Sequence, residues 1–216
     1  MAARTPSRWS GKQPDERRRE RRDLLLDTAY ELLGTAGAAG TTVRGVCEAA
    51  RLNPRYFYES FADLDELLVA VYDRAAVEAM TVMRDAQEAA SDDPLARSRA
   101  VVGALVAHFV DDPRRPRVLY LEGLGNEALA RRRMEAMRGL ATGLVREAAE
   151  QQPDDGSLDP VVEITATMIV GGFAELMLRW VHGELAVPDD ELVEDIAALF
   201  VAAGSAAEAI VGARTG

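Results

Sequence analysis

Two arginines, Arg44 and Arg55, have the chemistry needed to read DNA bases. A guanidinium can donate two hydrogen bonds to the O6 and N7 atoms of guanine, which contributes about 1–3 kcal/mol of discrimination. Tyr56 follows Arg55 and can place its ring against a thymine methyl group. Three nearby hydroxyl groups suit phosphate oxygens, namely those of Thr42, Tyr58 and Ser60. Each residue alone is typical of an ordinary exposed surface, but together they predict contact with double-stranded DNA.

Two short helices joined by a tight turn are expected to position these side chains. Thr42 can cap the first helix and Asn53 the second, because their side-chain oxygens can accept hydrogen bonds from free backbone N–H groups. Pro54 occupies the first position of the second helix, where its missing N–H costs nothing. Phe57 and Phe61 lie four residues apart and are expected to face inward, which turns the polar side outward. The pattern predicts a helix-turn-helix whose second helix, residues 53–60, enters a major groove.

The chain ahead of this motif is rich in arginine. Residues 1–14 are polar and lack hydrophobic periodicity, so they are predicted to form a disordered arm. A first helix is expected from Asp15 to Ala36. Its opening turns carry a cluster of five arginines, Arg17, Arg18, Arg19, Arg21 and Arg22. A soluble, frayed helix end would account for these charges, but beside a helix-turn-helix they favour phosphate contacts, with Arg17, Arg18 and Arg19 as the named candidates. Such contacts position a protein on DNA without reading its sequence.

Residues 20–75 resemble the TetR-type transcriptional regulators. The residues that carry the resemblance are spread over the expected helices: Thr41, Thr42, Val43, Val46, Glu48, Ala50, Pro54, Tyr58, Phe61, Asp65, Glu66, Leu67 and Leu68. Gly37 also lies where this family commonly ends its first helix. The resemblance implies a homodimer with a DNA-binding head and a helical body that encloses a small-molecule site.

Two positions depart from the family pattern. Arg51 stands where the family usually has a glycine in the turn, and only a left-handed backbone would penalise a side chain there. It is expected to distort the turn slightly or to add a phosphate contact. Leu64 stands where the family often places a phosphate-binding lysine, at the head of the next helix. This change removes one expected contact with the DNA backbone.

Charge is divided unevenly along the chain. The 216 residues carry a net charge of -11. Residues 1–60 hold 11 Lys and Arg against 8 Asp and Glu, a net +3, whereas residues 61–216 hold 14 against 28, a net -14. This asymmetry suits a protein that presents one end to phosphate and keeps the remainder away from it.

Composition disfavours several other classes. The single cysteine, Cys47, excludes an intramolecular disulfide framework and is interpreted as a small core residue. With only His108 and His182, no metal site or other cofactor is expected. No nucleophile motif is present, and Gly123 and Gly125 lack the preceding strand of a dinucleotide loop, so the chain is not expected to be an enzyme.

Localisation is expected to be cytoplasmic, with no membrane partner. The longest uncharged apolar stretches, near residues 100–110 and 164–174, are too short to span a bilayer. The arginine-rich N-terminus lacks the apolar segment that a secretory signal requires.

The expected fold is all-α, with a three-helix head and a six-helix body. Residues 15–62 are assigned to the helix-turn-helix domain and residues 63–216 to a ligand-binding and dimerisation domain. Helix breakers and caps place the body helices at about residues 63–90, 94–110, 114–121, 126–151, 158–185 and 188–211, with a loop at 152–156.

The last two helices carry large apolar faces that suit a dimer interface. A helix-turn-helix of this size usually reads a palindrome as a dimer, and a two-fold interface needs a self-complementary patch. Packing within one chain is the simpler alternative. The residues assigned to the interface mix small and bulky side chains: Ile164, Met168, Gly172, Leu176, Leu192, Ile196, Leu199, Phe200 and Ala203.

A small-molecule site is expected among the body helices. Its candidate walls are Met80, Met83, His108, Phe109, Tyr120, Met134, Met137, Met168, Phe173, Arg179 and Trp180. Methionine and aromatic residues at helical spacing are more often plain core. Arg179 lies on an apolar face and needs an anionic partner, for which Glu175 is the nearest candidate. His108 is interpreted as a hydrogen-bonded core or interface residue.

These patterns lead to the hypothesis of a homodimeric, ligand-responsive regulator, a repressor released from a palindromic operator by a small, mainly apolar effector. The alternative is a small-molecule-binding or structural helical dimer that has lost operator binding. Arg51, Leu64 and the overall acidity motivate that alternative.

Overall fold

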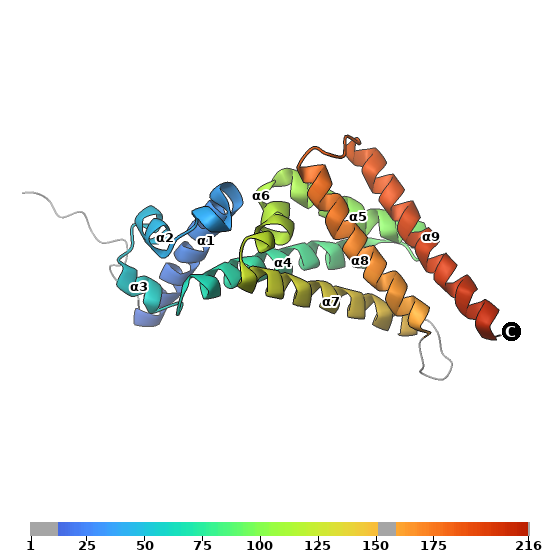
Figure 1. The fold of residues 1–216 in the computed structure, drawn as a ribbon, viewed down its shortest axis with the longest axis horizontal. Coiled ribbons are helices and arrows are strands. Elements are labelled where there is room, and N and C mark those ends of the chain that lie inside the picture. The colour runs from blue at the N-terminus through green and yellow to red at the C-terminus, as the bar shows by residue number, and fades with distance from the viewer. Residues whose placement is uncertain (1–12, 151–158, 216) are drawn as a thin grey trace, which may run out of the picture. The chain divides into compact units, whose positions relative to one another are not determined.

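The computed structural model describes residues 13–150 and 159–215, which form helices joined by turns without a strand among them. The α-helices of these residues are α1 (Pro14–Gly40), α2 (Val43–Ala50), α3 (Pro54–Tyr58), α4 (Leu64–Ala89), α5 (Pro94–Asp111), α6 (Arg114–Pro116), α7 (Glu127–Glu150), α8 (Pro160–Val181) and α9 (Asp189–Thr215) (Figure 1). A π-helical turn, η1 (Arg117–Leu121), and a 3-10 turn, η2 (Glu122–Leu124), separate α6 from α7. The all-α prediction is confirmed.

Two predicted segments lie wholly or partly beyond the described residues. The loop at 152–156 lies outside them, and so do residues 1–12 of the proposed arm. Of the last two arm residues, Pro14 is the first residue of α1 and Gln13 is its N-cap, whose N–H donates to the Glu16 carboxylate at 3.1 Å. The first helix therefore begins one residue earlier than expected.

The chain divides into two compact units between Val71 and Tyr72, inside α4. We call residues up to Val71 the head and those from Tyr72 the body. Because the division falls inside a helix, α4 contributes residues to both units.

The head has a dense apolar core beneath α1, α2 and α3. The core side chains are almost inaccessible to water: Leu25, Leu33, Val46, Phe57, Phe61, Leu67 and Leu68. Gly37 breaks α1 with φ of 75°, a left-handed conformation in which glycine avoids the clash of a Cβ atom. The buried Thr41 hydroxyl donates to the Gly37 carbonyl at 2.8 Å and stabilises this break. The expected helix end at Gly37 is thus confirmed.

The body is built on contacts of α5 with α9, α7 with α8, and α8 with α9. Ion pairs add to the apolar contacts: Arg99 on α5 binds Glu194 on α9, and Arg132 on α7 binds Asp73 on α4. Figure 1 shows α8 and α9 as an antiparallel pair joined by a short loop.

Three body helices differ from the sequence-based ranges, and one of them is α9, which ends at Thr215 rather than near residue 211. The helix expected to reach residue 185 ends at Val181, because Gly183 adopts φ of 69° and its N–H donates to the Trp180 carbonyl at 2.9 Å. This glycine-terminated C-cap satisfies carbonyls that would otherwise have no partner. The segment expected as one helix at 114–121 is instead α6 followed by the π-helical turn. Residue periodicity does not distinguish a π turn from an α turn over so few residues.

Candidate nucleic-acid interface

The recognition helix α3 is anchored by two phenylalanines. Phe57 and Phe61 expose only 0% and 2% of their surface, and their ring centroids lie 5.8 Å apart. The opposite side faces water, where the Arg55 side chain is 83% exposed and Tyr58 is 62% exposed. The inward orientation predicted for the phenylalanines is confirmed, and it leaves a short polar ridge on the outside of the head.

Helix caps hold the motif in this conformation. The Thr42 hydroxyl accepts from the Gly45 N–H at 3.0 Å, and the Asn53 side-chain oxygen accepts from the Arg55 N–H at 2.9 Å. Pro54 is the first residue of α3, as expected. These three positions therefore have a structural role in the helix caps, and their contact with DNA stays a prediction.

Both candidate base-reading arginines are held by carboxylates four residues further along. Arg44 Nε lies 2.7 Å from Glu48, and Arg55 Nε lies 3.2 Å from Glu59. Such exposed pairs contribute little to stability because water and salt screen them, so a contact with DNA can replace them. They nevertheless restrict the rotamers of the two arginines. The four-residue spacing is present in the sequence, but the sequence alone does not show that Glu48 and Glu59 bind these arginines.

Glu59 also joins α3 to α1. Its carboxylate lies 3.3 Å from Arg21, and its backbone carbonyl accepts from Arg18 at 2.6 Å. The Arg21 guanidinium stacks over the Tyr56 ring at 4.4 Å, a cation–π contact. Tyr56 is therefore only 37% exposed, because Arg21 lies over one face of its ring.

The arginine cluster of α1 is consequently more than a frayed helix end. Arg18 and Arg19 are exposed and Arg17 is half-buried. Arg21 and Arg22 were not among the named DNA contacts, yet they pack against α3 through Tyr56 and Phe61. Ser60 differs from expectation, because its hydroxyl oxygen is shielded from water instead of lying on the open surface.

The head of α4 is acidic. The Asp63 carboxylate accepts from the Glu66 N–H at 2.8 Å, and the Glu66 carboxylate accepts from the Ala62 N–H at 2.6 Å. These bonds cap the helix well, but they place two carboxylates where the family often has a lysine. No phosphate contact is expected at Leu64.

Arg51 occupies a left-handed conformation, with φ of 55° and ψ of 41°. We expect Arg51→Gly to raise the free energy of unfolding by about 1 kcal/mol, because the strain on the Cβ atom disappears. Urea unfolding followed by circular dichroism measures this gain. Arg44→Gly is the matched control, since the same change inside helical backbone should lower stability by a similar amount. An unfolding midpoint of Arg51→Gly at or below that of the natural sequence would contradict the prediction.

In the body, three of the proposed ligand residues lie in one aromatic cluster. The ring of Phe109, which is 1% exposed, lies 5.9 Å from those of both His108 and Tyr120. Burial raises the pKa of Tyr120, and the phenol of Tyr72 raises it further. Arg133 acts electrostatically on both phenols, and its Nε atom is buried without a hydrogen-bond partner among the described residues.

The other proposed ligand residues are dispersed. Met80, Met134 and Met168 are exposed, whereas Met83, Met137 and Trp180 are half-buried, and Phe173 packs edge-on against Phe200 at 5.9 Å. The expectation for Arg179 was wrong in two respects. Its side chain is 52% exposed, and its carboxylate partner at 3.7 Å is Glu184 rather than Glu175. The early end of α8 explains the change, because it turns Glu184 back towards Arg179.

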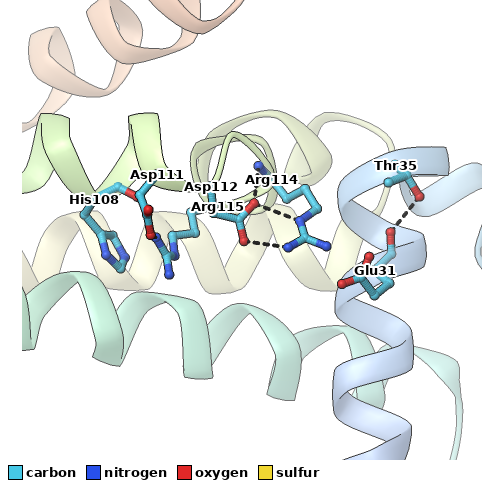
Figure 2. Close-up of polar contacts among 7 residues, drawn as sticks. All are labelled: Glu31, Thr35, His108, Asp111, Asp112, Arg114 and Arg115. Atoms are coloured by element: carbon cyan, nitrogen blue, oxygen red, sulfur yellow. Dashed lines mark hydrogen bonds and ion pairs between the residues drawn. The ribbon is translucent and has the colours of Figure 1, made fainter.

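Charged residues at the end of α5 and in α6 form ion pairs and hydrogen bonds next to His108 (Figure 2). Arg114 binds both oxygens of Asp112, at 2.8 and 2.9 Å. Arg115 donates to the His108 carbonyl at 2.7 Å and to Asp111 at 3.2 Å. Burial lowers the pKa of His108, and the Arg115 guanidinium lowers it further. Both effects favour the neutral form of the imidazole.

We expect His108→Asn to reduce the loss of stability in acid. The folded protein binds a proton at His108 less readily than the unfolded chain does, because its pKa is lowered. Above the unfolded pKa of about 6.5 neither state is protonated there, so His108 does not change the free energy of unfolding. As the pH falls below that value the unfolded chain takes up the proton first, which lowers the free energy of unfolding. The urea midpoint of the natural sequence should therefore fall more between about pH 7.5 and 5 than that of the variant. His182→Asn, at an exposed histidine, controls for loss of an imidazole. Parallel pH profiles for His108→Asn and the natural sequence would contradict the assignment.

The apolar faces of α8 and α9 are only partly covered. Leu192 and Ile196 expose 3% and 2% of their surface and belong to the core of the protomer, so they are not available to a partner. Four large apolar side chains remain exposed, Ile164, Met168, Leu199 and Ile210, and we call them the α8–α9 face. Beside them Gly172 is exposed, and Leu176, Phe200 and Ala203 are half-buried.

These two helices also revise the membrane argument. Both α8 and α9 are long and apolar enough to cross a bilayer by length and composition, and only 22% and 17% of their most apolar windows are buried. The uncharged apolar stretches of the sequence are shorter than these two helices, because isolated charged residues interrupt both of them. Length and composition fit a helix covered by another protein equally well.

Comparison with known proteins gives a consistent result. Residues 25–71 match the family described as bacterial regulatory proteins of the tetR family. The HTH-type transcriptional regulator BetI of Burkholderia thailandensis is 34% identical over 84 residues, which cover 39% of this chain and 43% of BetI. The match thus spans less than half the length of that relative.

Solved structures share the fold over most of the chain. A putative transcriptional regulator from Pseudomonas aeruginosa PAO1 superposes with a TM-score of 0.71 at 19% identity, covering 93% of this chain and 97% of that one. The regulator FadR from Bacillus subtilis, solved with stearoyl-CoA, superposes with a TM-score of 0.68 at 18% identity, covering 84% of this chain and 98% of that one. At these identities the likeness establishes the fold alone.

Proposed function

We propose that this chain is a TetR-type regulator: a homodimeric, ligand-responsive, sequence-specific DNA-binding protein that acts as a cytoplasmic repressor. The match of residues 25–71 to the tetR family of bacterial regulatory proteins and the 34% identity to BetI over 84 residues support this proposal. The observation that carries the proposal is the orientation of α3. Buried Phe57 and Phe61 turn Arg55, Tyr56 and Tyr58 outward, and capped helices hold that orientation. A short helix with such a surface fits a DNA major groove.

Dimerisation follows from the DNA geometry and from the α8–α9 face. Two heads that read a palindrome must engage major grooves about one turn, roughly 34–36 Å, apart. A two-fold interface requires one self-complementary patch on each protomer. The α8–α9 face supports this role, because its four large side chains would otherwise be solvated.

The effector is proposed to be a small, mainly apolar molecule bound in the body. The aromatic cluster of His108, Phe109 and Tyr120 supports this location, and its neutral imidazole and buried phenol favour an uncharged or weakly polar surface. The FadR relative binds stearoyl-CoA, a molecule with a long apolar chain. The helix α4 is the proposed coupling element, since it contributes residues to both units. Release of DNA then requires the effector to bind the released state more tightly than the DNA-bound state.

One observation keeps the alternative function in view. Glu48 and Glu59 occupy the reading side of the head, and Asp63 and Glu66 cap α4 where a lysine would favour DNA. A helical dimer that has lost operator binding would tolerate such charges. Selection of bound sequences from a random DNA pool distinguishes the two functions, because only the regulator enriches a palindrome whose binding depends on salt.

Arg55→Ala tests the assigned reading residue. We expect the affinity for the selected operator to fall by about 10- to 100-fold, corresponding to the 1–3 kcal/mol of a bidentate base contact, while affinity for unrelated DNA changes far less. Fluorescence anisotropy with both DNAs measures the ratio. Glu59 keeps its pairing with Arg21, so the change leaves no unpaired carboxylate. Arg138→Ala, at an exposed arginine of α7, is the charge-matched control. An unchanged specificity ratio would show that α3 does not read bases through Arg55.

A further inference from the structure

One carboxylate connects the proposed reading residue Arg55 to the first helix. The Arg55 Nε–H donates to Oε1 of Glu59 at 3.2 Å, and Nη2 of Arg21 donates to Oε2 of Glu59 at 3.3 Å. Each carboxylate oxygen therefore has its own guanidinium, one from α3 and one from α1. We call Arg55, Glu59 and Arg21 the Arg–Glu–Arg bridge.

The α1 end of the bridge is fixed by further contacts. The Arg21 side chain is only 14% exposed, and its guanidinium lies over the Tyr56 ring at 4.4 Å. Arg18 adds a second connection, because it donates to the Glu59 backbone carbonyl at 2.6 Å. Water and salt screen a shielded ion pair less than an exposed one. Glu59 is therefore held from the α1 side, whereas the Arg55 side chain that it binds is 83% exposed.

The pair of Arg44 and Glu48 lacks this support. These two residues have the same four-residue spacing, and Arg44 Nε lies 2.7 Å from the Glu48 carboxylate. Their side chains are 88% and 65% exposed, and the Glu48 carboxylate binds no second group among the described residues. Helical spacing thus gives both arginines a carboxylate, but of the two carboxylates it is Glu59 that is also tied to another helix.

The bridge leaves the outer end of the Arg55 guanidinium available. Glu59 accepts from Nε, while Nη1 and Nη2 of Arg55 hydrogen-bond to none of the described residues. The donors of a guanidinium lie in one plane, so fixing Nε also restricts the direction of the other two nitrogens. Those nitrogens can donate to the O6 and N7 atoms of guanine. A side chain that is oriented before binding loses less conformational freedom when it binds.

We propose that Glu59, held by Arg21, is a specificity-determining positioning residue that orients Arg55 towards a base without contacting DNA itself. This inference rests on the proposed function. The carboxylate acts on DNA binding in two opposite ways. Its negative charge disfavours every DNA, whereas its hold on Arg55 favours the operator alone. A carboxylate on the reading side of the head then increases discrimination between sequences at a cost in overall affinity.

Two variants of Glu59 separate position from charge. Glu59→Asp keeps the charge but shortens the side chain by one methylene, so it cannot keep both contacts, which are already 3.2 and 3.3 Å long. We expect the ratio of operator affinity to unrelated-DNA affinity to fall about three- to tenfold, the cost of ordering one flexible side chain on binding. The affinity for unrelated DNA should stay the same. Fluorescence anisotropy with both DNAs measures the ratio, and an unchanged ratio in Glu59→Asp overturns the proposal.

Glu59→Gln should lose the same discrimination, because a single amide oxygen replaces two carboxylate oxygens. It should also raise the affinity for unrelated DNA by about two- to fivefold, since one negative charge is removed. Asp23→Asn, at an exposed carboxylate of α1, is the matched control for charge. It should change the affinity for both DNAs by the same factor and leave their ratio intact. A ratio that falls equally in Asp23→Asn and Glu59→Gln would assign the effect to charge and overturn the proposal.

The Arg55→Ala background shows whether Glu59 acts through Arg55. In that background we expect Glu59→Gln to change the specificity ratio by less than about twofold, because the residue that it positions is absent. A loss as large as in the natural background would mean that Glu59 reads a base itself or acts through another residue. Either result overturns the proposal.

A measurement without DNA distinguishes failure of this inference from failure of the proposed function. Nitrogen-15 relaxation of the arginine Nε–H groups reports their motion on the picosecond to nanosecond timescale. In the natural sequence Arg55 should be more ordered than Arg44, and Glu59→Gln should remove the difference. Equal mobility of the two arginines overturns the inference even in a protein that binds an operator. A natural sequence that enriches no DNA from a random pool, with Arg55 ordered as expected, instead rejects the proposed function, and the specificity role with it.

Discussion

Phe57→Ala is expected to unfold the head and abolish operator binding. The side chain is fully buried, packs at 5.8 Å against Phe61, and meets the edge of Tyr58 at 5.2 Å. Truncating a buried phenylalanine typically removes about 3–5 kcal/mol, through lost apolar transfer and the cavity that remains. A small unit has little stability to spare, so a loss of this size is comparable with its whole free energy of unfolding.

Hydrogen exchange provides the measurement, because it reports each unit separately. In Phe57→Ala, amide protection should be lost from α1 to α3, while α5 and α9 remain protected. Tyr58→Ala is the matched control, since Tyr58 is 62% exposed and its removal leaves no cavity. Retained protection of α3 in Phe57→Ala would show that the phenylalanine does not anchor the recognition helix, and the proposed function would then lose its main support.

Leu199→Glu is expected to convert the proposed dimer to a monomer. Leu199 is 63% exposed in the protomer, so the substitution should change the stability of the isolated chain by no more than about 0.5 kcal/mol. In a two-fold interface each substitution occurs twice, which buries two unpaired carboxylates and costs several kcal/mol. Dimerisation should weaken by at least about 100-fold, and operator affinity should fall with it because only one head is engaged at a time.

Sedimentation at several concentrations measures the dimerisation constant. Val77→Glu introduces the same charge at an α4 residue that is 62% exposed, and this control should remain dimeric. A Leu199→Glu protein that sediments as the natural sequence does, at every concentration, would remove α9 from the interface. The buried residues Leu192 and Ile196 are unsuitable for this test, because a charge there would unfold the protomer itself.

Local rules predicted the head well. Thr42, Asn53 and Pro54 act at their expected positions, and Phe57 and Phe61 are buried as their spacing requires. Caps and helix periodicity involve residues within about one turn of each other, so the sequence contains them directly. The left-handed backbone at Arg51 shows the limit of such rules, since the arginine occupies the glycine conformation without any local signal that it does so.

Long-range partners could not be predicted in this way. Nothing in the spacing links Arg21 to Tyr56 or Arg22 to Phe61, because these pairs depend on how α1 packs against α3. The shielding of the Ser60 hydroxyl arises from the same packing.

By itself, the sequence determined the all-α fold, the helix-turn-helix and the division between basic residues 1–60 and acidic residues 61–216, since these follow from periodicity, capping and charge along the chain. Only the tertiary structure decided which apolar residues of the last two helices are buried within the chain and which stay exposed. Leu192 and Leu199 have the same side chain and lie on the same helix, yet one is 3% exposed and the other 63%. The physical reason is that burial depends on which side of α9 meets α5 and α8, and a helix that is apolar on several sides leaves that choice to packing.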